Sequence, residues 1–466
     1  MKIIPHGAAR EVTGTCHEIR LESGRRILLD CGLFQGKRKE AAVKNADVPF
    51  ETQDIDAIVL THAHGDHVGR IPVLHKKGLQ SPVFCTYATR DLAEIMLQDS
   101  AYIQEKDEEY FRKHVRASTM LRDGPLYTQE DARGCMRLFR GQNYNEWFEV
   151  CEGVRAQLIE AGHIVGAAMV VLEIAEGGIA HRVGFSGDLG RNMLPIIRDP
   201  ADMPPLDVLL CESTYGNRRH EDIAAARHVL RDVVTRTARR GGKVLIPAFS
   251  LERTQELVYD LHILWDAKEI PAVPIFIDSP LATKVTDIFM KHPECYDREM
   301  YEKFLSKAHN PFRFSLVQYT ESPEDSKALN GMPGPMVIMA GSGMCEAGRI
   351  RHHLRNGVED PRNTVLAVGY MAENTLGRRL IERNVGEVKI FDETYQKKAE
   401  TLFINAYSGH ADMADLDRFV ARTEGLKKII LVHGESGQME PFAQRIRLAR
   451  PETEVYMPER GEEIAV

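Results

Sequence analysis

The sequence predicts an α/β protein built from two or three domains. The chain has 466 residues, which is too long for one ordinary hydrophobic core. Hydrophobic residues make up 43% of it and aromatic residues 7%, a composition typical of globular proteins. Apolar runs of strand length alternate with helical patterns through the middle of the chain, and this alternation is typical of α/β folds.

The chain carries no sign of a membrane segment or an export signal. No apolar stretch approaches the roughly 20 residues that span a membrane, and the first residues lack the apolar core of a signal peptide. The eight cysteines are scattered without a C-x-x-C pair, as expected of reduced, buried thiols. We therefore expect a cytoplasmic protein that has no membrane partner.

The first part of the chain, residues 1–205, mixes strands with a few helices. A charged helical pattern runs from Arg90 to His114, and a second helix starts at Thr128, with Asp131 placed to complete its cap. Apolar strand patterns precede them at Cys16–Leu21, Arg26–Asp30, Ala57–Leu60 and Val83–Thr86.

The middle part, residues 206–395, has a regular alternation of strands and helices, which predicts a mostly parallel, doubly wound sheet. Helices are expected to start at Leu251, Ala282, Ala347 and Thr375. Each follows one of the strand patterns Lys243–Ala248, Pro274–Asp278, Met336–Ala340 and Thr364–Gly369. Residues 396–466 then add strand, helix, strand and helix.

The most informative segment is the hexapeptide His62-Ala63-His64-Gly65-Asp66-His67. It directly follows the apolar strand Ala57–Leu60, so the strand end holds the side chains while the glycine lets the turn fold back. Imidazole suits zinc, and a carboxylate completes or bridges such a site. Two alternate histidines share one side of the extended segment, and the Asp-His pair lies beyond it, which favours two adjacent metals over one.

Other strand patterns also end in residues that bind metals. Asp30 ends a strand, His163 follows the strand Val154–Ile159, Asp188 lies in a glycine-flanked turn after a strand, and His433 ends Lys428–Val432. A polar residue after a strand is most often a turn former, so each position alone is weak. Together they form a series in one structural context.

This order of elements resembles the metallo-β-lactamase superfamily, and between Glu212 and His410 it resembles the β-CASP branch of nucleic-acid-processing nucleases. That branch includes stand-alone bacterial and archaeal ribonucleases and the endonuclease subunit of the eukaryotic pre-mRNA cleavage machinery. Its three extra motifs match Leu209–Gly216, with the acid Glu212; Tyr407–Asp412, with His410; and Leu431–Glu435, with His433.

The resemblance implies an αββα sandwich with an inserted α/β domain. The first sandwich segment is then residues 1–205, the insertion 206–395, and the returning segment 396–466. Because His433 must reach the same metals as His62, the last segment is expected to pack against the first.

The resemblance also implies two Zn²⁺ per chain, with His62, His64 and His163 on one and Asp66, His67 and His433 on the other. Asp188 would bridge them. Asp30 would orient ligands or water, and Asp66 would take part in catalysis as well as in metal binding. His410 would be the general acid and Glu212 its partner.

A glycine-rich turn in the insertion is a further candidate site. Backbone N–H groups at Ser342, Gly343 and Met344, with Arg349 nearby, are placed to hold a substrate phosphate, and the family uses such a loop to grip the nucleic-acid backbone. An ordinary tight turn in an α/β sheet explains the same residues.

The implied function is a zinc-dependent ribonuclease, with RNA as partner and a homodimer expected. Three alternatives stay open: a DNA-directed nuclease of the same type, a dinuclear-zinc hydrolase of small esters or thioesters, and a silent RNA-binding subunit. The net charge of −8 excludes a broadly basic nucleic-acid surface, although two zinc ions would add four positive charges locally.

Overall fold

The computed structural model describes residues 1–114, 124–305, 310–369, 371 and 375–466, and the chain forms two compact units. The first unit contains Met1–Met193, Arg198–Arg219 and Gly409–Val466. The second contains Leu194–Ile197 and His220–Ser408.

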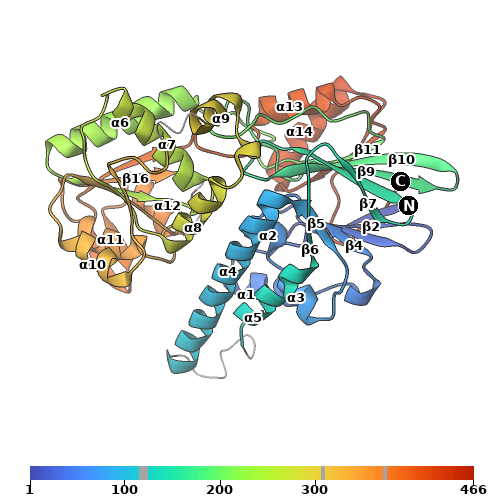
Figure 1. Ribbon diagram of the computed structural model, residues 1–466, viewed down its shortest axis with the longest axis horizontal. Coiled ribbons are helices and arrows are strands. Elements are labelled where there is room, and N and C mark those ends of the chain that lie inside the picture. The colour runs from blue at the N-terminus through green and yellow to red at the C-terminus, as the bar shows by residue number, and fades with distance from the viewer. Residues whose placement is uncertain (115–123, 306–309, 370, 372–374) are drawn as a thin grey trace. The chain divides into compact units, whose positions relative to one another are not determined.

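The first unit is a sandwich of two sheets (Figure 1). One sheet has the order β22-β1-β2-β3-β4-β5-β6. Its strands are β22 (Ile464–Ala465), β1 (Lys2–Gly7), β2 (Cys16–Arg20), β3 (Arg26–Leu29), β4 (Ala57–Val59), β5 (Val83–Thr86) and β6 (Phe139–Gln142). The other sheet has the order β21-β20-β11-β10-β9-β8-β7. Its strands are β21 (Glu454–Tyr456), β20 (Lys428–Val432), β11 (Val208–Glu212), β10 (Ile179–Phe185), β9 (Ala168–Glu176), β8 (Val154–Glu160) and β7 (Trp147–Cys151).

One hydrophobic core joins the two sheets. It includes Ile3 and Val59 from the first sheet and Val170, Leu210 and Ile430 from the second, all of them buried. Helix α4 contacts β5 and β6 on one side, and α14 contacts β20 and β21 on the other, so helices cover both outer faces. The helices are α1 (Arg38–Ala46), α2 (Gly65–Val68), α3 (Ile71–Lys76), α4 (Tyr87–His114), α5 (Gln129–Cys135), α13 (Met413–Arg422) and α14 (Ser436–Ala449), with short turns η1 (Thr52–Asp54) and η3 (Met136–Leu138). The αββα sandwich is confirmed.

The second unit is built on a six-stranded sheet of order β14-β13-β15-β12-β16-β19, and every pairing in it is parallel. The strands are β12 (Lys243–Pro247), β13 (Ile275–Ile277), β14 (Val317–Tyr319), β15 (Met336–Ala340), β16 (Thr364–Val368) and β19 (Glu400–Ile404), with a separate antiparallel pair β17 (Glu387–Ile390) and β18 (Glu393–Gln396). The helices are α6 (Ile223–Arg239), α7 (Arg253–Asp266), α8 (Pro280–Phe289), α9 (Arg298–Leu305), α10 (Pro323–Gly331), α11 (Ile350–Gly357) and α12 (Leu376–Ile381), with the short turn η4 (Pro293–Cys295). The parallel sheet expected from the sequence is confirmed.

The unit boundaries lie later in the chain than the sequence suggested. Residues 206–219 stay with the first unit because β11 pairs in parallel with β10 and β20. Residues 396–408 stay with the second unit because β19 pairs with β16. The final segment does pack into the first unit, through β20 and α14.

A search of the described residues for a helix long and apolar enough to cross a membrane found none.

Candidate metal centre

Side chains that follow neighbouring strands of the first unit converge on one place. The parallel register aligns Phe185 with Leu210 and Glu212 with Val432, so the carboxyl ends of β10, β11 and β20 lie side by side. This edge receives Asp30 after β3, His62 and His64 after β4, Asp66 and His67 on α2, His163 after β8, Asp188 after β10, Glu212 at the end of β11, and His433 after β20.

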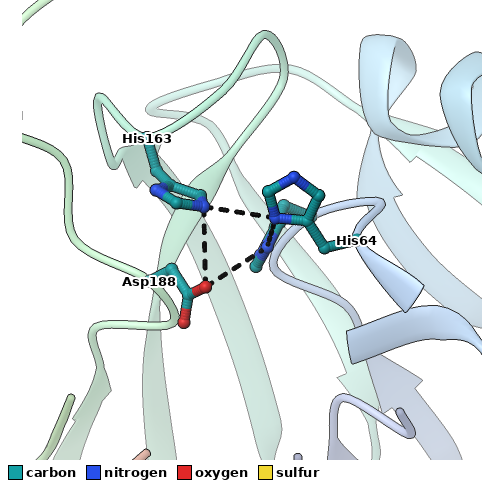
Figure 2. A group of neighbouring side chains, drawn as sticks. His64, His163 and Asp188 are labelled. Atoms are coloured by element: carbon teal, nitrogen blue, oxygen red, sulfur yellow. Dashed lines mark hydrogen bonds and ion pairs between the residues drawn. The ribbon is translucent and has the colours of Figure 1, made fainter. Parts of the chain in front are cut away.

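The first group that can hold a metal contains His62, His64, His163 and Asp188. Nδ1 of His64 lies 3.0 Å from Nε2 of His62 and 3.3 Å from Nε2 of His163. Oδ2 of Asp188 lies 3.5 Å from each of these Nε2 atoms. Figure 2 shows the side chains of His64, His163 and Asp188 pointing toward one another.

The second group contains Asp66, His67 and His433. Nε2 of His67 lies 3.3 Å from Nε2 of His433, which lies 3.7 Å from Oδ2 of Asp66. The other oxygen of Asp188, Oδ1, lies 3.2 Å from Nε2 of His67. The two oxygens of the Asp188 carboxylate therefore face two different groups of ligand atoms.

Outward hydrogen bonds fix the tautomers of these histidines. Nδ1–H of His163 donates to the carbonyl of Gly409 (3.1 Å), and Nδ1–H of His67 donates to Asp30 (2.7 Å). Both bonds leave the inward Nε2 atom with its lone pair. His64 is the exception in this part of the site, because its Nδ1 atom points inward.

Two threonines fix the remaining pair of rings. The hydroxyl of Thr61 donates to Oδ2 of Asp30 (2.7 Å), so it accepts from Nδ1–H of His62 (3.1 Å). The hydroxyl of Thr214 donates to the backbone carbonyl of His433 (3.1 Å) and accepts from Nδ1–H of the His433 ring (3.0 Å). Sequence reasoning missed both threonines; their positions directly before His62 and two residues after Glu212 are the signal that could have found them.

Burial and neighbouring charges shift the pKa values of this cluster in both directions. Burial lowers the pKa of His62 and His163 well below the ordinary value, and lowers that of His64 to about 4. Burial also opposes charge on His67, yet Asp188 and Asp30 outweigh it and raise the pKa of His67 well above 6.5. In the same way burial opposes ionisation of Asp66, but His433 and His67 lower its pKa to about 2.

The donor set fits zinc. Ligands about 2.0–2.1 Å from a tetrahedral zinc lie about 3.3 Å from one another, close to the separations of 3.0–3.7 Å found here. Oδ1 of Asp188 is buried without a hydrogen-bond donor, and it faces inward lone pairs of imidazole. Lone pairs held together in this way repel one another unless a cation lies between them.

The backbone at two of these positions is strained. Asp30 has φ of 60° and His433 has φ of 49°, so two residues other than glycine adopt the left-handed conformation within one site. Each costs on the order of 1–3 kcal/mol, and such strain is typical of functional sites.

Glu212 and His410 form a pair beside the cluster. Nδ1–H of His410 donates to Oε1 of Glu212 (3.2 Å), which also accepts from the backbone N–H of Leu189 (2.6 Å). Nε2 of His410 lies 3.9 Å from Oδ2 of Asp188. Burial opposes charge on the ring, but Glu212 and Asp188 raise the pKa of His410 to about 10.

The glycine-rich turn of the second unit differs in part from the expectation. The Ser342 hydroxyl donates to the carbonyl of Ala347 (3.2 Å), and Ser342 is half-buried. The guanidinium of Arg349 bonds Oδ1 of Asp278 at 2.7 Å and the carbonyl of Thr320 at 3.1 Å. This occupied guanidinium argues against Arg349 as a phosphate ligand, while Ser342, Gly343 and Met344 stay a prediction.

Three family models match the chain. The Metallo-beta-lactamase superfamily matches residues 9–82, the Beta-Casp domain residues 254–380, and the Zn-dependent metallo-hydrolase RNA specificity domain residues 394–458.

Three curated relatives match nearly all of this chain. A ribonuclease of Thermus thermophilus is 37% identical over 466 residues, covering 100% of both chains. The transcription termination factor FttA of Methanocaldococcus jannaschii is 32% identical and covers 97% of this chain and 70% of its own. The cleavage and polyadenylation specificity factor 73 of Drosophila melanogaster is 30% identical and covers 96% and 61%.

A solved structure adds evidence on the fold alone. The crystal structure of a protein of unknown function from Enterococcus faecalis V583 aligns with a TM-score of 0.56 at 13% identity, covering 100% of this chain and 99% of the other.

Proposed function

Because this chain belongs to the β-CASP branch of the metallo-β-lactamase superfamily, we propose that it is a zinc-dependent ribonuclease that hydrolyses RNA phosphodiester bonds with two metal ions. The observation that carries the proposal is Asp188, whose two oxygens face two separate groups of histidine ligands. RNA as substrate is supported by the relatives described above.

The ligand atoms of each zinc follow from the tautomers. Nε2 of His62, Nδ1 of His64 and Nε2 of His163 would hold one ion. Oδ2 of Asp66, Nε2 of His67 and Nε2 of His433 would hold the other, and Asp188 would serve both. Bound zinc lowers the pKa of water to roughly 7 and neutralises charge on phosphoryl oxygens, which is the chemistry that phosphodiester hydrolysis needs.

Asp30 acts through His67. Both of its oxygens are satisfied, Oδ1 by the backbone N–H of Thr61 (2.7 Å) and Oδ2 by the Thr61 hydroxyl and the His67 ring. The carboxylate holds the ring in one orientation and increases the basicity of its Nε2 atom. Asp30 is therefore a positioning residue in this proposal.

His410 is placed to protonate the leaving oxygen. Its Nδ1–H is held by Glu212, so the second proton, on Nε2, is the one that can be given up. Glu212 is itself fixed by the backbone N–H of Leu189, and its own N–H donates to the Ser186 hydroxyl. The pair thus delivers a proton from one defined atom on the edge of the metal cluster.

Two further parts of the proposal concern the whole molecule. We propose a cytoplasmic location, supported by eight free cysteines, since structural disulfides are rare in that compartment. A homodimer is expected from the family resemblance, and light scattering of the purified protein measures it directly.

The deciding experiment incubates the zinc-loaded protein with end-labelled single-stranded RNA, DNA of the same sequence and a chromogenic ester. The proposal expects cleavage of RNA, much slower cleavage of DNA and no turnover of the ester. His410→Ala is the matched control, because it removes the proton donor and leaves the proposed zinc ligands in place. Ester turnover without RNA cleavage would refute the assignment, and equal cleavage of RNA and DNA would refute the RNA preference.

A further inference from the structure

The loop Tyr215–Arg219, directly after Glu212, is held rigidly at the edge of the metal centre. The guanidinium of Arg445 donates to the carbonyl of Gly216 (2.7 Å), and the backbone N–H of Met413 donates to the carbonyl of Arg218 (3.0 Å). The side chain of Asn217 donates to the carbonyl of Gly437 (3.2 Å). A Cβ at Gly216 would lie 2.6 Å from the carbonyl oxygen of Gln438, so the loop packs directly on α14.

Arg218 lies on the face of an aromatic ring that contacts the candidate acid. Its guanidinium carbon is 4.6 Å from the centroid of the Tyr215 ring, a cation–π arrangement. Tyr215 is buried, and its ring centroid is 6.0 Å from that of His410 at an interplanar angle of 66°. These two distances place the guanidinium carbon of Arg218 within about 11 Å of the centre of the His410 ring.

The guanidinium of Arg218 is exposed and pairs with no carboxylate among the described residues. Neighbouring arginines differ in this respect. Arg445 bonds Asp417 at 2.8 Å, and Arg418 bonds Asp415 at 3.0 Å. Arg218 therefore offers an uncommitted, planar cation on a rigid support beside the proton donor, in a protein whose net charge is −8. Planar guanidinium groups bind phosphate through two parallel hydrogen bonds.

We propose that Arg218, stacked on Tyr215, binds a backbone phosphate of the RNA strand on the leaving-group side of the scissile bond. The side follows from His410, because the leaving oxygen must lie next to the group that protonates it. This inference rests on the proposed function, and it adds a binding residue outside the metal ligands and the acid pair. Because the Tyr215 ring already orders the Arg218 side chain, less conformational entropy is lost when RNA binds, and the free energy of binding is more favourable.

The test measures KM and kcat for a short fluorescent single-stranded RNA at several KCl concentrations. Arg218→Ala is expected to raise KM about tenfold, the effect of losing one charge-assisted hydrogen bond, and to change kcat far less. The slope of log(1/KM) against log[KCl] should become shallower by about 0.7, the value for one phosphate contact on a single strand.

Two variants control for charge and geometry. Arg219→Ala removes a neighbouring exposed charge that, within the part of the chain that the structure describes, stacks on no aromatic ring, so KM should change by less than about twofold. Arg218→Lys keeps the charge but loses the planar contact. Its salt dependence should therefore equal that of the wild type, while its KM should lie between those of the wild type and Arg218→Ala.

Hydrolysis of bis(p-nitrophenyl) phosphate by the wild-type protein separates the proposed nuclease activity from the proposed role of Arg218. This small diester has no flanking phosphate for Arg218 to bind. If the wild type cleaves both substrates while Arg218→Ala and Arg219→Ala share the wild-type KM and slope, the Arg218 inference falls and the proposed function stands. A loss of kcat without a rise in KM in Arg218→Ala also overturns the inference. A wild-type protein that cleaves neither substrate removes both claims.

Discussion

Asp30→Asn should weaken one metal site and leave the other intact. The Asp30 carboxylate accepts three hydrogen bonds of 2.7 Å, from the Thr61 N–H, the Thr61 hydroxyl and Nδ1–H of His67. An amide has only one oxygen, so in either orientation its NH₂ group meets at least one of these donors. The His67 ring then loses its fixed orientation and its charged partner.

Loss of such an outer partner costs about 10–100-fold in metal affinity, which is about 1.4–2.7 kcal/mol. The loss should fall on the site of Asp66, His67 and His433, because Asp30 contacts His67 directly. The site of His62, His64 and His163 should keep its affinity, apart from a small effect through Thr61, which contacts both rings.

The assay is competition with a chromophoric chelator, which resolves a tight and a weak zinc, together with the metal content after dialysis. Asp54→Asn is the matched control, since Asp54 is an exposed acid that pairs with Arg26 at 3.3 Å and lies outside the metal cluster. Wild-type affinity at both sites would refute the role given to Asp30. An equal loss at both sites, in a protein with an unchanged thermal transition, would refute the division into two groups.

Three other changes test separate parts of the account. His410→Ala should keep both zinc ions by metal analysis and lose about 10²–10⁴-fold in turnover; loss of zinc would instead make it a ligand. Gly32→Ala should lower the free energy of unfolding by at least about 3 kcal/mol, because the added Cβ would lie 1.6 Å from the carbonyl oxygen of Asp66. Urea unfolding measures this, and a variant whose unfolding midpoint equals that of the wild type would contradict it. Burial raises the pKa of Glu160 to about 8, so the folded state holds a proton that the unfolded state releases above pH 4.5. Stability should therefore fall from pH 5 to pH 8 by on the order of 4 kcal/mol, and Glu160→Gln should remove this slope; parallel pH profiles of the two proteins would contradict the shift.

The cluster of candidate ligands was predictable because most of its members directly follow an apolar strand. Parallel strands end at the same edge of a sheet, so Asp188 and His433 meet although 245 positions of the sequence separate them. The alternation of strands and helices likewise predicted the parallel sheet of the second unit, since such crossovers require it.

Other features depend on contacts that a linear pattern does not contain. The sequence does not show that Nδ1 of His64 points inward, or that one oxygen of Asp188 lies near His62 and the other near His67. The unit boundaries depend on which sheet β11 and β19 join. The sequence does not show that the guanidinium of Arg349 bonds Asp278, because 71 positions of the sequence separate the two residues.

An anomalous difference map recorded at the zinc absorption edge, on crystals of the zinc-loaded protein, would show whether two zinc ions lie between these histidines and carboxylates. We expect two peaks, one bounded by His62, His64 and His163 and the other by Asp66, His67 and His433, with the Asp188 carboxylate between them. A single peak, or a peak away from Asp188, would contradict it.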